Sequence, residues 1–166
     1  MKVWITNIST SKFAGINTLW AAMMREDFIP DKVHLIHLHS GKVDKESQKT
    51  ARIGYLNLLK RYGNPEKLVL HDYDETKFSN IARDMQSLVR EEKSEGNTVA
   101  IDMTPGRKFM SAFSMYMGVG LGLEHKADKI YYLHVKELGQ YSGLPFPMIP
   151  SNLMTLYDLK KEVTGK

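Results

Sequence analysis

Two adjacent cations, Arg107 and Lys108, stand where a helix is expected to begin, in the segment Asp102-Met103-Thr104-Pro105-Gly106-Arg107-Lys108-Phe109-Met110-Ser111. A helix N-terminus normally attracts acidic side chains, because its free N–H groups and macrodipole make that end positive. Thr104 suits the N-cap and Pro105 the first helical position, which would put both cations in the first turn. A docked polyanion would neutralise them and accept the free backbone donors. The segment therefore predicts a phosphate-bearing ligand; a solvated helix start is the alternative.

A second group of polar side chains follows the first expected strand. Asn7 ends this strand, and Ser9, Thr10, Ser11 and Lys12 come directly after it. In an open α/β sheet, ligands bind beyond the carboxyl ends of the strands, where the loops after the first and fourth strands flank the reversal of strand order. We therefore expect the hydroxyl-rich loop and the cationic segment to face each other across one crevice. For any single serine, capping of the following helix is the alternative role.

Histidines mark the ends of the next two expected strands. His37 and His39 lie two positions apart on one strand and so share a face, and His71 and Asp72 end the following strand. A metal site can be drawn from these side chains, but their spacing is not typical of one, and we expect no metal. His39 or His37 could instead contact a ligand or transfer a proton.

The elements that position these residues alternate between strand and helix along the chain. The third helix is the clearest example, since apolar residues recur at helical spacing between charged ones. This alternation predicts an α/β fold: a Rossmann-like, open, mainly parallel sheet with helices on both faces. The expected strands cover residues 2–8, 32–39, 67–71, 98–102 and 129–135, and the expected helices cover residues 15–25, 44–61, 76–95 and 105–122.

The alternation breaks after residue 135. Residues 136–150 are rich in proline and glycine and predict a hairpin or ordered loop, and residues 151–163 predict a final helix. Tyr141 and Phe146 in the loop could close over a ligand and stack on it, or could be buried in an edge hairpin. No linker divides the chain, so we expect a single domain over residues 1–166.

Composition excludes several classes of protein. The 166 residues include no cysteine, which excludes disulfides, zinc-cysteine sites and a thiol nucleophile and fits a cytoplasmic protein. No signal-peptide pattern opens the chain, and the most apolar helix is too short to span a membrane. A scattered net charge of +4 does not predict binding of long nucleic acids. No Gly-x-Gly-x-x-Gly follows the first strand, which disfavours a nicotinamide or flavin cofactor; we expect no cofactor.

The segment of residues 102–111, together with the hydroxyl-rich loop, resembles the CARF family, the CRISPR-associated Rossmann-fold domains. Members commonly carry an Asp-x-Thr-Gly-Gly-Thr-Lys-like segment here, which contacts cyclic oligoadenylate at a two-fold dimer interface. This chain has Pro105 in place of the first glycine and Arg107 in place of the threonine. Arginine is chemically suited to binding phosphate. The resemblance implies a CARF-like domain that acts as a homodimer.

The chain leaves room after the sheet only for a hairpin and a helix, and a stand-alone domain of this kind resembles a ring nuclease. Such an enzyme degrades the cyclic oligoadenylate messenger, here expected to be the tetra-adenylate, and turns off the antiviral signal. The ribose 2′-hydroxyl attacks the phosphorus without metal and leaves linear adenylates with a 2′,3′-cyclic phosphate. A non-catalytic sensor or sponge acting through a partner effector is the alternative. We expect Lys108 and Ser11 to be catalytic, and the ligand to contact Asn7, Ser9, Thr10, His39, Thr104, Pro105, Gly106, Arg107, Ser111 and Tyr141.

A stripe of small residues follows the cationic segment. Ser111, Ser114, Gly118 and Gly122 recur at helical spacing and permit close approach of another backbone. The helix could use this stripe to pack on its own sheet or on a second subunit. A dimer is expected from the ligand, because a two-fold ring is best held by two identical crevices.

Overall fold

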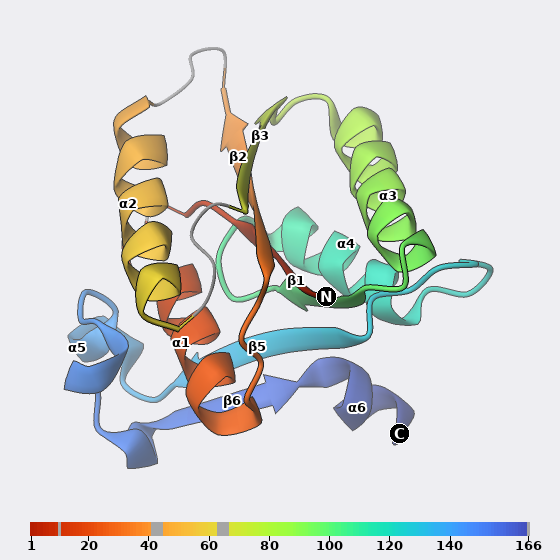
Figure 1. The fold of residues 1–166 in the computed structure, drawn as a ribbon. Coiled ribbons are helices and arrows are strands. Elements are labelled where there is room, and N and C mark those ends of the chain that lie inside the picture. The colour runs from red at the N-terminus through yellow and green to blue at the C-terminus, as the bar shows by residue number, and fades with distance from the viewer. Residues whose placement is uncertain (10, 41–44, 63–66, 166) are drawn as a thin grey trace.

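A computed structural model describes residues 1–9, 11–40, 45–62 and 67–165 of the chain. Its six-stranded sheet has the order β3-β2-β1-β4-β5-β6 (Figure 1). The strands are β1 (Lys2–Asn7), β2 (Lys32–His39), β3 (Leu68–Asp74), β4 (Thr98–Asp102), β5 (Lys129–Val135) and β6 (Met154–Asp158). The helices are α1 (Ala14–Glu26), α2 (Lys45–Tyr62), α3 (Phe78–Ser94), α4 (Lys108–Val119), α5 (Leu138–Tyr141) and α6 (Leu159–Thr164), with 3₁₀ turns η1 (Phe146–Met148) and η2 (Ser151–Leu153).

The strand order reverses between β1 and β4. Strands β1 to β5 pair in parallel, and β6 pairs antiparallel with β5 at one edge. The chain moves from β1 outward to β2 and β3, then returns to place β4 on the other side of β1. The loops after β1 and β4 therefore emerge side by side at the carboxyl edge. This confirms the predicted Rossmann-like sheet and the expected position of its switch point.

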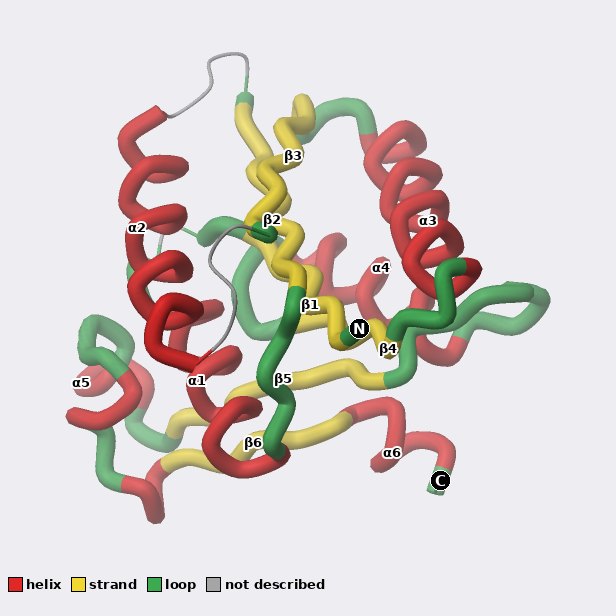
Figure 2. The backbone as a smooth tube through the Cα atoms, in the orientation of Figure 1, coloured by secondary structure: helices red, strands yellow, loops and turns green. Residues whose placement is uncertain are grey.

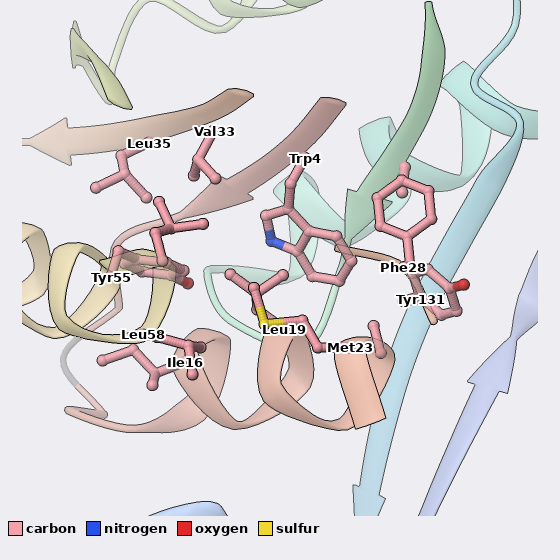
Figure 3. Close-up of a cluster of buried hydrophobic side chains, with 13 residues drawn as sticks. Trp4, Ile16, Leu19, Met23, Phe28, Val33, Leu35, Tyr55, Leu58 and Tyr131 are labelled. Carbon is pink, nitrogen blue, oxygen red and sulfur yellow. The ribbon is translucent and has the colours of Figure 1, made fainter. Parts of the chain in front are cut away.

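Each face of the sheet carries its own hydrophobic core. On the α1 and α2 face, Trp4 is fully buried and stacks on Tyr131 with ring centroids 5.5 Å apart (Figure 3). On the opposite face, alternate residues such as Val3 and Ile5 pack with side chains of α3 and α4. This alternation follows from strand geometry, in which successive side chains point to opposite faces. No described helix is long and apolar enough to cross a membrane.

The predicted final helix is wrong in its first half. The stretch predicted as one helix, residues 151–163, contains η2, then strand β6, and only then the short helix α6 (Figure 2). Met154 and Leu156 alternate with the exposed Thr155 and Tyr157, which is the two-residue period of a strand. The free edge of β5 offers backbone partners to this short segment, so sheet pairing prevails over helix formation.

Residues 136–150 do not form the hairpin that was one of the two expected arrangements. They form an ordered connection that contains α5 and η1, and the buried Asn17 of α1 holds it in place. The Asn17 side chain donates to the carbonyl of Leu144 at 2.9 Å and accepts from the amide of Phe146 at 2.7 Å. The Phe146 ring stacks on Trp20 of α1, with centroids 6.0 Å apart. Phe146 is therefore part of the packing against α1.

The small residues of α4 pack mainly against the protein's own sheet. Ser114 is fully buried, and Gly118 faces the side chain of Ile130 in β5. The helix ends at Val119, so Gly122 lies outside it with a φ of +78°. The structure therefore uses the central part of the predicted stripe for intramolecular packing, and the homodimer stays a prediction.

Gly118→Ala should destabilise the protein. A Cβ at this position would lie 2.6 Å from Cγ1 of the buried Ile130, which has no space to move. We expect the free energy of unfolding in urea to fall by about 1–2 kcal/mol, because overpacking outweighs the gain in helix propensity. Gly139→Ala is the matched control, since nothing lies within 4 Å of a Cβ there. Equal stability of the two variants would contradict this account of α4 packing.

Candidate functional site

A buried carboxylate organises the loop after β4. Asp102 is fully buried at the end of β4, and its Oδ2 accepts a hydrogen bond from the Thr6 hydroxyl of β1 at 3.1 Å. Its Oδ1 accepts from the backbone N–H of Thr104 at 2.9 Å. Tyr55 of α2 donates to the same Thr6 hydroxyl at 3.4 Å. Burial raises the pKa of Asp102 to about 7, although these hydrogen bonds oppose the shift.

This turn corrects the expected start of α4. Thr104 is not the N-cap: its hydroxyl accepts from the backbone N–H of Leu133 in β5 at 2.9 Å. Arg107 is the N-cap residue, and Lys108 is the first residue of the helix. The buried Pro105 precedes the helix instead of opening it, and Gly106 has a φ of +108° that favours glycine. The local capping signal fails because Asp102 and β5 offer Thr104 stronger partners.

The two expected cations differ in their surroundings. Arg107 forms an ion pair with Glu75, with Nη2 of the arginine 2.8 Å from Oε2 of the glutamate. Lys108 is exposed, and no described residue pairs with its charge. Ser111, one turn further on, donates its hydroxyl to the carbonyl of Met103 at 3.3 Å. Lys108 is therefore the cation at this helix start that can meet an anion without losing a partner.

Asn7 and Gly106 bring the two loops into contact. A Cβ on Gly106 would lie 3.2 Å from Nδ2 of Asn7, so glycine permits this close approach. Asn7 is 3% exposed, and its side-chain oxygen has no hydrogen-bond partner among the residues that the structure describes. A buried polar oxygen without a partner is unfavourable unless something else supplies the hydrogen bond. This atom marks the switch point as a place where a ligand donor or water could bind.

Other predicted residues gather around a small pocket. Ser11, Thr104 and Tyr141 line it together, from the loop after β1, the loop after β4 and α5. The pocket has a volume of about 50 Å³, with Leu133 and Ile149 among its apolar walls. Ser9 accepts the backbone N–H of Ser11 at 3.0 Å, and neither serine caps α1, whose N-cap is Phe13 without a side-chain bond. Thr10 lies outside the described residues.

The histidines do not assemble the metal site that could be drawn from the sequence. His37 pairs with Asp72, whose Oδ1 lies 2.9 Å from Nδ1 of the histidine. His71 faces the opposite side of the sheet, where its Nε2 lies 2.8 Å from Nδ1 of His34. Within the described ranges, no group of three or more His, Cys, Asp or Glu side chains could hold a metal ion. The His39 ring stacks on the His37 ring, with centroids 6.1 Å apart. His39 lies beyond Ile36, the last residue of β2 that pairs with β1.

The sequence did not indicate two residues that shape the candidate site, Asn17 and Glu75. Asn17 tethers the segment that carries Tyr141, and a polar residue on the buried face of an apolar helix was the signal that could have found it. Glu75 follows β3 and neutralises Arg107, which follows β4, although β2 and β1 lie between these two strands in the sheet. No local pattern in the sequence indicates this second contact.

The pH dependence of stability should reveal the buried Asp102. In the folded protein the pKa of Asp102 is raised from its ordinary value of 3.8 to about 7, so folding takes up a proton between these pH values. The contribution of Asp102 to stability therefore falls as pH rises through this window. Measured by urea unfolding, Asp102→Asn should gain stability relative to wild type, by up to a few kcal/mol, from about pH 4 to pH 8.

The same comparison separates the contribution of Asp102 to the pH dependence of stability from that of His34. Burial lowers the pKa of His34 to about 4, so this group favours the fold increasingly as pH rises, opposite in sign to Asp102. Because His34 is present in both proteins, it cancels in the difference between wild type and variant. Parallel stability curves for the two proteins would show that Asp102 does not hold a proton in this range.

Comparisons with known proteins identify the family and the fold of this chain. A family model described as CRISPR-associated protein NE0113 matches residues 20–142. A search of curated proteins finds no match. A solved structure of Enterococcus italicus Csm6 bound to cyclic hexa-2′-fluoro-hexa-dAMP has a TM-score of 0.56 at 16% identity, covering 83% of this chain. The matched region is only 34% of that Csm6 chain, and at this identity the likeness establishes the fold. The family match shows that the chain belongs to the CRISPR-associated protein NE0113 family, and its fold resembles that of the Csm6 structure.

Proposed function

We propose that the crevice between the loops after β1 and β4 binds cyclic oligoadenylate and cleaves it. The observation that carries this proposal is the meeting of the two loops, where the side chain of the buried Asn7 lies against Gly106, close in sequence to Lys108. Among the described residues, the side-chain oxygen of Asn7 has no hydrogen-bond partner and Lys108 has no ion-pair partner. A site with free backbone donors, an exposed cation and hydroxyls suits a phosphodiester. The family membership supports a role in CRISPR defence.

The similar Csm6 structure supports the choice of ligand. Its ligand is a ring of six adenylates in which fluorine stands at the 2′ position. In a natural ring this position carries the hydroxyl that we expect to be the nucleophile. Fluorine cannot attack phosphorus, so such a ring is also a suitable uncleavable probe. We expect cyclic tetra-adenylate to be the ligand of this protein, and cyclic hexa-adenylate serves as the comparison ligand.

The proposed reaction needs positioning and charge stabilisation more than a strong base. The 2′-oxygen attacks the phosphorus and loses its proton, while the bond from phosphorus to the 5′-oxygen breaks and that oxygen gains a proton. Lys108 stabilises charge on the phosphate and the leaving oxygen, and Ser11 orients the ribose or phosphate. Arg107 holds phosphate after release from Glu75. The products are linear adenylates with a 2′,3′-cyclic phosphate.

A homodimer completes the proposed site. One crevice meets only part of a two-fold ring, whereas two identical crevices related by the same symmetry meet all of it. The two copies of Lys108 would then lie at equivalent phosphates of the ring. Tyr141, half-buried beside Ser11 and Thr104, is placed to contact an adenine at the margin of the crevice.

Purified protein should convert labelled cyclic tetra-adenylate to linear products in the presence of EDTA. The nucleophile is part of the substrate, so turnover should continue at an unchanged rate when divalent cations are removed. Product masses should correspond to adenylates ending in 2′,3′-cyclic phosphate. An intact ring under saturating binding would favour the non-catalytic sensor or sponge, and failure to bind either ring size would overturn the proposal.

Lys108→Ala should lower the single-turnover rate about 100-fold or more, because one well-placed charge stabiliser is lost. Ser11→Ala should lower turnover or binding and leave the urea unfolding curve unchanged, since its half-buried side chain lies in a loop. Lys60→Ala, an exposed change on α2, is the matched control for lost charge and should cleave at the wild-type rate. Wild-type rates in both test variants would show that the site is misplaced.

A further inference from the structure

The ion pair between Arg107 and Glu75 places one of the protein's own anions at the start of α4. The guanidinium Nη2 lies 2.8 Å from Oε2 of Glu75. The Arg107 side chain is 65% exposed, whereas that of Glu75 is 16% exposed. The carboxylate is thus the sheltered partner and the arginine the accessible one. A second anion that approaches Arg107 from solvent meets a group that is already neutralised.

The turn that carries Glu75 is held rigidly. Asp74 accepts hydrogen bonds from the backbone N–H of Thr76 at 3.0 Å and from its hydroxyl at 2.7 Å. The backbone N–H of Glu75 donates to the carbonyl of His39 at 3.0 Å, which ties the turn to the end of β2. A preorganised carboxylate competes well for a cation, because little side-chain and backbone freedom is lost on pairing.

Aromatic packing holds the two helix starts together. Phe78, the first residue of α3, meets Phe109 of α4 edge to face, with ring centroids 4.8 Å apart. This contact fixes the turn before α3 beside the turn before α4. Glu75 and Arg107 therefore meet through tertiary packing, although their strands are not neighbours in the sheet.

We propose that Glu75 sets the affinity of the crevice by competing with a ligand phosphate for Arg107. This inference rests on the proposed function, binding of cyclic oligoadenylate. A phosphate that takes Arg107 leaves the sheltered Glu75 carboxylate without its partner and lies close to its charge. A ligand with several phosphates offsets this cost through further contacts with Lys108 and the loop amides. A ligand with one phosphate has fewer contacts with which to offset it.

Glu75 could have the opposite role, and the direction in which its removal changes ligand affinity distinguishes the two. If Glu75 served to orient Arg107 toward the ligand, its removal would loosen the arginine and weaken binding. If Glu75 competes, its removal frees the arginine and strengthens binding. Glu75→Gln keeps the size and shape of the side chain and one acceptor oxygen, and it removes the charge by replacing the other oxygen with an NH2 donor.

The experiment measures the dissociation constants of cyclic 2′-fluoro tetra- and hexa-adenylate, which cannot be cleaved by 2′-hydroxyl attack. We expect Glu75→Gln to bind the ring roughly two- to fivefold more tightly than wild type at low salt, which is the scale of an exposed ion pair. The gain should shrink as salt is raised. In an Arg107→Ala background, Glu75→Gln should give a smaller gain, because the arginine is no longer there to be released.

Glu91→Gln is the matched control for net charge. Glu91 is an exposed acid near the far end of α3, and we expect its variant to bind like wild type. Unfolding curves in urea verify that both variants are folded. Equal or weaker binding by Glu75→Gln, with wild type binding well, overturns this inference alone. Wild-type protein that binds neither ring overturns the proposed function and this inference with it.

Discussion

The geometry of the candidate site depends on the buried carboxyl group of Asp102. It joins β4 to β1 through Thr6 and fixes the turn at Thr104, at the one place where the strand order reverses. A buried carboxyl is tolerated only when donors satisfy it, so the loop has little freedom to adopt another path. That path sends the Thr104 hydroxyl to β5 and delays the start of α4 until Lys108. The position of the free cation follows from a hydrogen-bonded acid that itself is inaccessible to a ligand.

The two faces of the sheet contribute different chemistry to the same edge. The turn into α1 supplies hydroxyls, and the turn into α4 supplies cations, while the contact between Asn7 and Gly106 keeps the two sides together. The segment after β5 closes one flank, because Asn17 holds it by two hydrogen bonds. These contacts hold the two loops in place in the unbound protein, and the proposed function relies on such preorganisation to stabilise charge.

Most of the fold could be predicted from sequence because its signals are local. β2, β4 and β5 have the predicted boundaries, since buried strands with turn residues at each end are distinctive over a few residues. The main helices follow from the spacing of apolar residues and differ from prediction at their ends. The prediction of a final helix was wrong for a nonlocal reason: Met154–Asp158 is a strand because β5 has a free edge beside it.

The candidate site, like the fold, has features that the sequence indicated and features that only the tertiary structure decided. Residue types alone indicated that the loops after β1 and β4 carry anion-binding groups, because hydroxyls, cations and glycine have intrinsic chemistry wherever they lie. Only the tertiary structure decided which of two adjacent cations is paired, since Glu75 neutralises Arg107 from a distant turn, whereas no residue that the structure describes pairs with Lys108. It also decided that Thr104 bonds to β5 instead of capping a helix. Ion pairs and hydrogen bonds between remote segments depend on distances in space, and sequence spacing does not encode these.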